Sequence, residues 1–277
     1  MRKRLLGAIA LAAASALALA GCGSDDGGSG GGGDKKITIG IKFDQPGLGF
    51  KDGDKYSGFD VDVATYIAKK LGYSADQITW KESPSAQRET LLSTHQVDMV
   101  VATYSITDER KKTVAFAGPY FVAGQDLLVK NDNTDITGPE SLDGKKLCSV
   151  TGSTSAQKIK DTYADKVNLV EYPGYAECVT ALTSGAVDAV TTDDIILAGL
   201  AAQPANKGKV KVVGKPFTTE NYGVGLPQDN KTCQQVTDAI KDMVSDGSWQ
   251  KFLDTNLEGT GYKPDASKNP PTPAACG

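Results

Sequence analysis

The turn Gly152-Ser153-Thr154-Ser155 combines residue types and a position that suit the binding of an anion. It connects an expected strand, 147–150, to an expected helix, 155–163. Backbone N–H groups at the start of a helix are free and, with the helix dipole, favour an anion such as a carboxylate. We therefore expect Ser153 and Thr154 to contact an anionic ligand. The alternative is that these hydroxyls only cap the helix.

Other reactive chemistry has little support in the sequence. Ser155-Ala156-Gln157-Lys158 matches the S-x-x-K pattern of penicillin-recognising acyl enzymes, but no S-D-N or K-T-G box follows, and we reject that interpretation. The single histidine, His95, argues against a Ser-His-Asp enzyme, a multi-histidine metal site or a histidine relay. The sequence has no P-loop, so we expect no ATP hydrolysis. The chain has 30 Lys and Arg against 34 Asp and Glu, a mild acidity that argues against nucleic acid as a partner.

The cysteines point to disulfides and not to a metal site. Apart from Cys22, they are Cys148, Cys178, Cys233 and Cys276, an even set. In an exported chain such a set favours disulfides, and four cysteines allow three pairings. Proximity in the sequence favours Cys148–Cys178 and Cys233–Cys276. No C-x-x-C spacing occurs, and the only histidine is distant in sequence, so we expect no zinc, no other metal and no cofactor.

The first residues have the pattern of an export signal. Met1–Arg4 is basic, and the uncharged, mostly apolar run from Leu5 to Ala20 is short for a membrane span. Leu19-Ala20-Gly21-Cys22 resembles the lipobox of bacterial lipoproteins, in which the cysteine receives a lipid and becomes the mature N-terminus. We expect a signal peptide at 1–21 and a lipidated Cys22 followed by a flexible Gly/Ser-rich tether to residue 36. The alternative is an ordinary cleaved signal with an incidental cysteine.

The folded part alternates strands and helices, which predicts mostly parallel sheets flanked by helices. A second, similar α/β rhythm follows the first: Leu92–Val100 (LSTHQVDMV) parallels Leu182–Val190 (LTSGAVDAV) almost position by position. We expect Asp98 and Asp188, which enter the strands of these two segments, to be turn or cap residues. The expected strands are 37–43, 78–81, 97–103, 147–150, 167–172, 187–191 and 222–226, and the expected helices are 59–71, 86–93, 155–163, 176–184, 232–245 and 248–256.

This repeat predicts two α/β lobes with a ligand cleft between them. We expect lobe 1 to contain 37–121 and 220–277, and lobe 2 to contain 125–217. Hinges are expected near 122–124 and 218–222. The tail from Gly259, with four prolines, is expected to be irregular and pinned by Cys276.

Four segments in order resemble one family: GFDVDVATYIAKKLG (58–72), VDMVVATYSITDERKKTVAFAGPYF (97–121), CSVTGSTSAQ (148–157) and VDAVTTDD (187–194). The chain resembles the extracellular polar-amino-acid-binding proteins of ABC importers, solute-binding protein family 3, over about residues 37 to 256. IKFDQPGLGF (41–50), ESPSAQRETL (82–91) and Cys148 are similar to the glutamate-binding lipoproteins of Gram-positive bacteria. The resemblance implies a type II periplasmic-binding-protein-like fold and no enzymatic activity.

The resemblance also implies ligand-binding roles for the polar residues of these segments. Arg110 is expected to clamp the α-carboxylate, because its guanidinium binds a carboxylate in bidentate fashion. The alternative for Arg110 is a surface salt bridge with Asp108 or Glu109. Asp193 is expected to bind the α-ammonium, with Asp194 as its rival. The residues expected to complete this shell are Ser153, Thr154, Thr103 and Ser105.

Two basic residues are expected to select an acidic side chain. Lys42 follows the first strand, and Arg88 begins a helix after Pro84. In the related glutamate and aspartate binders, basic residues at these places bind the ligand's side-chain carboxylate. The alternative for each is a solvated cation, and Lys111 and Lys112 are expected to be solvated. Phe43, Phe50 and Tyr104 are expected to wall the cleft, unless they are core aromatics.

The expected function is therefore capture of glutamate or aspartate by lobe closure at the extracellular face of the cell membrane, to which lipid on Cys22 anchors the protein. We expect the protein to be a monomer, and its implied partners are an ABC permease and the ATPase of that permease. One alternative is an amino-acid sensor for a signalling partner. Another is a dehydratase on the same scaffold, for which Glu82 is the best unassigned carboxylate.

Overall fold

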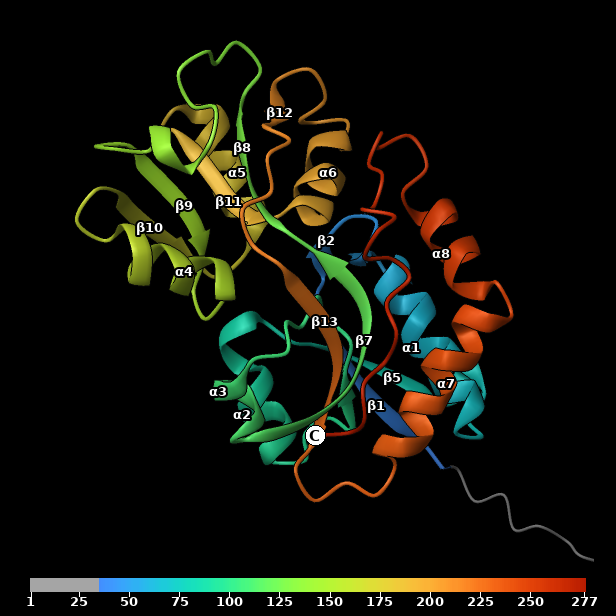
Figure 1. Cartoon of the computed structure of the whole chain (residues 1–277). Coiled ribbons are helices and arrows are strands. Elements are labelled where there is room, and N and C mark those ends of the chain that lie inside the picture. Colours follow the sequence, from blue (N-terminus) through green and yellow to red (C-terminus); the bar gives the residue numbers. More distant parts are fainter. Residues whose placement is uncertain (1–34) are drawn as a thin grey trace, which may run out of the picture. The chain divides into compact units, whose positions relative to one another are not determined.

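The computed structural model describes residues 35–277, and the expected leader, lipidated Cys22 and most of the tether lie outside the described residues. Two five-stranded sheets organise the described part (Figure 1). Lobe 1 has the strand order β5-β1-β6-β13-β7, and lobe 2 has the order β10-β9-β11-β8-β12. The chain leaves lobe 1 through β7 and returns to it through β13, so lobe 2 is a continuous insertion.

Lobe 1 is assembled from both ends of the described chain. Helices α1, α7 and α8 pack together on one side of its sheet, and α2 contacts the sheet strands β6, β7 and β13. Its elements are β1 (Ile37–Ile41), α1 (Phe59–Lys70), β5 (Ile78–Glu82), α2 (Arg88–Ser93), β6 (Met99–Val100), α3 (Asp108–Lys111), β7 (Val114–Ala123), β13 (Glu220–Pro227), α7 (Cys233–Ser245) and α8 (Ser248–Asn256).

Lobe 2 repeats the arrangement within one stretch of chain. Its elements are β8 (Gln125–Lys130), β9 (Lys146–Val150), α4 (Thr154–Tyr163), β10 (Asn168–Tyr172), α5 (Tyr175–Ser184), β11 (Ala189–Asp193), α6 (Asp194–Ala202) and β12 (Val210–Val212). A small antiparallel sheet, β2 (Asp44–Gln45), β3 (Gly49–Asp52) and β4 (Lys55–Ser57), follows β1 and contacts α5 and α6 of lobe 2 through β2. The sequence did not predict this sheet.

Each main sheet is mixed. In lobe 1, β1 pairs in parallel with β5 and β6, whereas β13 pairs antiparallel with β6 and β7. Lobe 2 has the same division, with β9 parallel to β10 and β11, and β8 antiparallel to β11 and β12. The parallel strands are the predicted β-α-β units. The antiparallel strands include β7, β8 and β13, which carry the chain between the lobes.

The internal repeat is confirmed in atomic detail. Asp98 accepts a hydrogen bond from the Thr38 N–H (2.7 Å), and Asp188 accepts the equivalent bond from the Lys146 N–H (2.8 Å). Both carboxylates therefore join the start of one strand to its parallel neighbour, which confirms their structural role. The preceding helices both end in the left-handed conformation, at His95 (φ 52°) and Gly185 (φ 82°). His95 thus occupies a helix-terminating position that is glycine in lobe 2.

Two strand predictions were wrong in extent. The strand expected over 97–103 contains only Met99–Val100, and Thr103, inside the expected range, has a left-handed φ of 46° that does not fit a strand. The strand expected at 187–191 is shifted to Ala189–Asp193, so Asp193 is its last residue.

The tail is irregular, as predicted, and lies along β7. The Ala274 N–H donates to the Gly118 carbonyl (2.8 Å), and the Asn269 amide pairs with both backbone groups of Val122. Both disulfides have the favoured pairing, Cys148–Cys178 and Cys233–Cys276, and the second attaches the tail to α7. Within residues 35–277, no helix has the length and apolar character needed to cross a membrane.

Candidate ligand-binding site

A small polar cavity of about 10 Å³ lies where the two lobes meet. Only Ile196 is apolar among its lining residues. The volume holds about one water molecule, whereas ligand pockets typically measure about 300–1,000 Å³. A ligand of amino-acid size therefore requires the lobes or the lining side chains to move apart. The lining residues are Ser85, Arg88 and Thr103 of lobe 1, with Ser153, Thr154, Ser155, Tyr175, Thr192, Asp193 and Ile196 of lobe 2.

Arg110 lies in the adjoining pocket, of about 530 Å³, and not in the small cavity. Ser153 and Thr154 line both spaces and form the wall between them. The structure therefore brings Arg110 together with the turn at 152–155, as the sequence predicts, but it separates Arg110 from Asp193.

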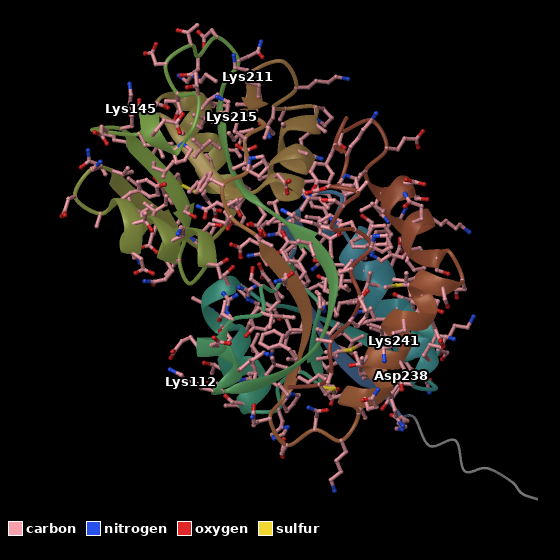
Figure 2. The ribbon with its side chains drawn as sticks, in the orientation of Figure 1. Lys112, Lys145, Lys211, Lys215, Asp238 and Lys241 are labelled. Carbon is pink, nitrogen blue, oxygen red and sulfur yellow. A yellow bond between two sulfur atoms is a disulfide. The ribbon has the colours of Figure 1, made fainter. Side chains whose placement is uncertain are left out.

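The guanidinium of Arg110 is bound by three protein acceptors. It donates to the carbonyl of Ser105 (2.7 Å) and, across the cleft, to that of Gly152 (3.2 Å), while its Nε lies 3.1 Å from Glu89 Oε1. Because Arg110 is 8% exposed and pairs with Glu89, the alternative interpretation, a surface salt bridge to Asp108 or Glu109, is wrong. Lys112 is solvated, as the sequence predicts: it is exposed, pairs with the exposed Glu109, and lies at the periphery of the molecule (Figure 2).

Arg88 and Arg110 both contact the ring of Tyr104. Their guanidinium carbons lie 4.2 and 4.9 Å from the ring centroid. Burial and, second to it, the charge of Arg110 lower the pKa of Arg88 to about 10. Two buried cations at one aromatic ring favour a bound anion between the lobes. Tyr104 is fully buried and also packs on Phe116, so it belongs to the core as well as to this site.

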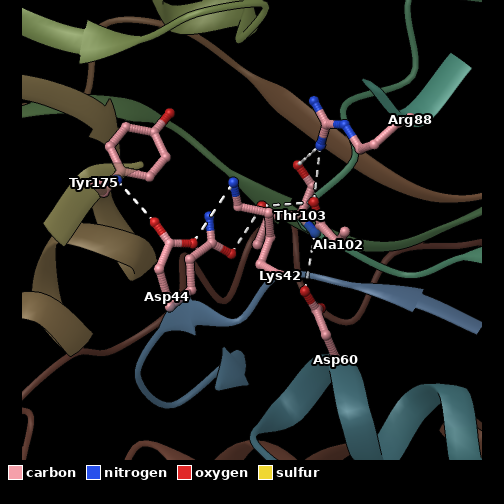
Figure 3. A network of polar contacts seen from close by, with 8 residues as sticks. Lys42, Asp44, Asp60, Arg88, Ala102, Thr103 and Tyr175 are labelled. Atoms are coloured by element: carbon pink, nitrogen blue, oxygen red, sulfur yellow. Dashed lines mark hydrogen bonds and ion pairs between the residues drawn. The ribbon is translucent and has the colours of Figure 1, made fainter. Parts of the chain in front are cut away.

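Lys42 is buried beside the small cavity, so the solvated alternative is wrong for it, as it is for Arg88. Its ammonium lies 3.6 Å from Asp44 Oδ1 and 5.9 Å from the ring centroid of Tyr175 (Figure 3). Burial lowers the pKa of Lys42, the Asp44 carboxylate raises it, and Arg88 lowers it again. Lys42 and Phe43 line a pocket of about 120 Å³ together with the exposed Glu82.

Asp193 places an incompletely paired carboxylate in the cavity. Its Oδ2 accepts a hydrogen bond from the Tyr222 hydroxyl (2.6 Å), but its buried Oδ1 has no hydrogen-bond partner among the described residues. Burial raises the pKa of Asp193 well above its usual range, and the Glu220 carboxylate raises it further. A cation beside Oδ1 would stabilise the ionised form. Its rival, Asp194, instead accepts from the backbone N–H groups of Gly124 and Ile195.

The turn at 152–155 requires its glycine. Gly152 has a left-handed φ of 77°, and a Cβ there would lie 2.7 Å from the Cα of Ala86 in lobe 1. Ser153 caps α4 by accepting from the Ala156 N–H (2.9 Å), so the capping interpretation is correct for its side chain. Thr154 meets Ser105 across the cleft at 3.3 Å between hydroxyl oxygens. The backbone of lobe 2 thus comes very close to lobe 1 at this turn.

The remaining predicted wall residue, Phe50, is half-buried on β3 and lines neither the cavity nor the pockets of Arg110 and Lys42. The sequence interpretation missed Tyr175, Ser85 and Thr192, which line the cavity. Thr192 lies near the carboxyl end of β11, and Tyr175 begins α5 shortly after β10 ends. Ligands bind in α/β sheets beyond the carboxyl ends of strands, and that position was the available signal.

The arrangement suits recognition of a zwitterion with an additional acid group. Three buried cations, Lys42, Arg88 and Arg110, surround an interlobe region that also contains the buried Asp193. Lys42 and Arg110 already have carboxylate partners, whereas the Nε of Arg88 and the Oδ1 of Asp193 have no hydrogen-bond partner within residues 35–277. Buried charges are costly unless they are paired, so a ligand that supplies both a cation and an anion would satisfy Arg88 and Asp193. Within residues 35–277, no cluster of three or more His, Cys, Asp or Glu side chains is arranged to bind a metal.

Comparison with known proteins identifies the class. Residues 37–258 match the bacterial extracellular solute-binding proteins, family 3, and the chain belongs to that family. A glutamate-binding protein of Corynebacterium efficiens is 47% identical over 233 residues, covering 80% of this chain and 78% of the relative. A glutamine-binding protein of a Bacillus subtilis ABC transporter is 39% identical over 221 residues, covering 78% and 79%. An ancestral arginine-binding protein bound to arginine has a TM-score of 0.75 at 35% identity, covering 80% of this chain and 98% of that one. These similarities confirm the predicted fold class.

Proposed function

We propose that this protein captures an acidic amino acid, glutamate or aspartate, between its lobes on the extracellular side of the membrane and delivers it to an ABC permease. Lipid on Cys22 would hold it at the cell surface. The observation that carries the proposal is a pair of unpartnered polar atoms on two residues that line one cavity: Arg88 Nε and Asp193 Oδ1 are both buried without hydrogen-bond partners among the described residues. An amino acid supplies the two complementary groups, a carboxylate and an ammonium.

In this proposal, each lobe holds a different part of the ligand. Asp193 of lobe 2 receives the α-ammonium, and Arg110 with the turn at 152–155 receives the α-carboxylate. Arg110 would exchange its Gly152 or Glu89 partner for the ligand, since both now engage it. Lys42 and Arg88 receive the side-chain carboxylate, with Thr103 and Ser105 completing the shell. Hinges at 122–124 and 218–222 would allow the lobes to separate.

The acidic side chain is supported by two independent facts. Lys42 and Arg88 are 2% and 3% exposed and lie on the lobe 1 side of the interlobe contact. The chain is also more similar to a glutamate-binding relative, at 47% identity, than to a glutamine-binding one, at 39%. Delivery to a permease is supported by the ABC transporter to which the Bacillus subtilis relative belongs.

Calorimetric titration of the protein with glutamate, aspartate, glutamine and arginine tests the proposal. We expect one-to-one binding of glutamate or aspartate, with glutamine and arginine much weaker. Lys42→Met should weaken glutamate binding by about 10- to 150-fold, the effect of a lost hydrogen bond to a charged group, and should leave glutamine binding unchanged. Lys51→Met is the matched control, because Lys51 is exposed on the adjacent hairpin.

The outcomes separate the parts of the proposal. A preference for glutamine or arginine would refute the specificity argument and leave amino-acid capture standing. Failure to bind any of the four would refute capture itself. Uptake of labelled glutamate by cells that lack the protein tests delivery: unchanged uptake would favour a sensor over a transport role.

A further inference from the structure

Asp60 is a fully buried carboxylate at the start of α1 that does not line the cavity. Its Oδ2 accepts from the backbone N–H of Thr103 (2.9 Å), and its Oδ1 accepts from the Tyr120 hydroxyl (2.7 Å). Burial raises the pKa of Asp60, these two donors and the charge of Arg88 lower it, and the net pKa is about 6, so the carboxylate is mostly ionised at pH 7. Hydrogen bonds to an ionised acceptor are stronger than neutral ones. Asp60 therefore holds Thr103 firmly.

Thr103 needs such support because of its backbone conformation. Its φ of 46° is left-handed, a conformation that β-branched residues rarely adopt. Besides the Asp60 bond, its hydroxyl lies 2.8 Å from the Ala102 carbonyl and 3.1 Å from the buried Oε1 of Gln45, either of which can accept its single proton. The strained residue is thus fixed at its N–H by Asp60 and at its hydroxyl by these two acceptors.

The conformation of Thr103 determines where Arg88 can lie. With the chain turned at this point, the carbonyl of Ala102 accepts from Arg88 Nη1 at 2.9 Å and that of Thr103 lies 3.5 Å from the same atom (Figure 3). One end of the guanidinium is held by these carbonyls. The Nε is buried and has no partner among the described residues, and Arg88 lines the cavity.

We propose that Asp60 is a positioning residue for side-chain specificity: it fixes the backbone at Ala102–Thr103, and these carbonyls orient Arg88 toward the ligand's side-chain carboxylate. This inference rests on the proposed capture of an acidic amino acid. Asp60 touches no ligand in it and acts only through Thr103 and Arg88. The variant Asp60→Asn has nearly the same shape, but its amide offers one acceptor atom for two donors.

The measurement is the ratio of glutamate affinity to glutamine affinity, determined by calorimetry at pH 7. We expect Asp60→Asn to lower the ratio about tenfold, the effect of one misplaced hydrogen bond to a charged group, while glutamine binding stays near that of the wild type. Asp62→Asn is the matched control, since Asp62 lies two residues along α1 and bonds Asn256 instead. It should leave the ratio unchanged.

A double-mutant cycle separates positioning from a general structural role. If Asp60 acts through Arg88, Asp60→Asn should have no further effect on the ratio in an Arg88→Met background. An equal loss for both ligands, or an effect that persists without Arg88, would overturn the proposal.

Two further outcomes are decisive. If Asp60→Asn does not fold, Tyr120→Phe removes one of the two donors and should lower the ratio by about threefold, the effect of one ordinary hydrogen bond. An unchanged ratio in that variant would overturn the inference. If the wild type does not bind glutamate, the proposed function and this inference are both overturned. If the wild type prefers glutamate over glutamine and Asp60→Asn keeps the same affinity ratio, only the positioning role is overturned.

Discussion

Replacing Asp193 with asparagine separates ligand binding from stability within a single residue. The amide preserves the shape of the side chain and an oxygen that accepts the Tyr222 hydroxyl, now 2.6 Å from Oδ2. It removes the negative charge that the proposed α-ammonium would pair with. It also removes an ionisable group whose charged form is disfavoured first by burial and then by the Glu220 carboxylate. The substitution should therefore weaken binding without weakening the ligand-free fold.

The magnitude follows from burial. Asp193 is 3% exposed, so its contact with an ammonium would be a desolvated charge pair. Truncating one member of such a pair costs about 2–5 kcal/mol, which corresponds to about a 30- to 4,000-fold loss of glutamate affinity. For stability, burial raises the pKa of Asp193 in the folded protein above its unfolded value of about 3.9. Above about pH 4 the carboxyl therefore ionises more readily in the unfolded chain, and the free energy of unfolding falls as the pH rises. The variant lacks this loss and should be at least as stable as the wild type at pH 7.

Calorimetry with glutamate and thermal unfolding of the ligand-free protein at pH 7 and pH 4 measure both effects. The stability advantage of Asp193→Asn should shrink at pH 4, where the wild-type carboxyl is protonated. Asp194→Asn is the control: Asp194 Oδ1 accepts from the N–H groups of Gly124 and Ile195, and asparagine retains this oxygen, so the variant should fold and retain glutamate affinity. If Asp193→Asn binds glutamate as tightly as the wild type, Asp193 is not the receptor of the ammonium group. If the variant unfolds at a lower temperature than the wild type at pH 7, the argument that ionised Asp193 destabilises the ligand-free fold is refuted.

Two further predictions concern the lobes. Asp44 accepts from the Tyr175 N–H across the cleft at 2.8 Å and also pairs with Lys42, so the closure effect of Asp44→Asn is measured with glutamine, which does not need Lys42. Glutamine affinity should fall by about 3- to 10-fold, and an unchanged glutamine affinity in calorimetry would contradict a closure role. Removing the Cys148–Cys178 disulfide, which joins residues 30 apart, by alanine at both positions should lower the free energy of unfolding by about 3–4 kcal/mol in urea titration, and an unchanged midpoint would contradict this.

Sequence periodicity predicted the helices well because their apolar faces are local patterns. The predicted helix 248–256 matches α8, and the predicted helix 59–71 ends one residue beyond α1. The pairing of β13 with β6 and β7 was not predictable in this way, since it joins segments about 100 residues apart. The strands of the small sheet at 44–57 were missed because they are two to four residues long and carry mostly polar residues.

The candidate site shows the same division between local and distant information. Arg88 and Asp193, which line the cavity, lie in recognisable segments and were predicted as site residues from the sequence. Asp60 was not, because an acidic residue in the first turn of a helix is expected from the helix dipole alone. Its actual partners, Thr103 and Tyr120, are 43 and 60 residues away. The ion pair of Arg110 with Glu89 was hidden for the same reason.

The path of the chain through the two lobes has a consequence for biogenesis. Strand β13 lies between β6 and β7 in the lobe 1 sheet, so β7 has no sheet neighbour until residues 220–227 emerge. All five strands of lobe 2 are complete by residue 212. At synthesis rates of about 5–20 residues per second, β7 waits roughly 5–20 s for its partner. A newly made chain would therefore pass through a stage in which lobe 2 is assembled and a largely buried strand, β7, is still exposed to chaperones and proteases.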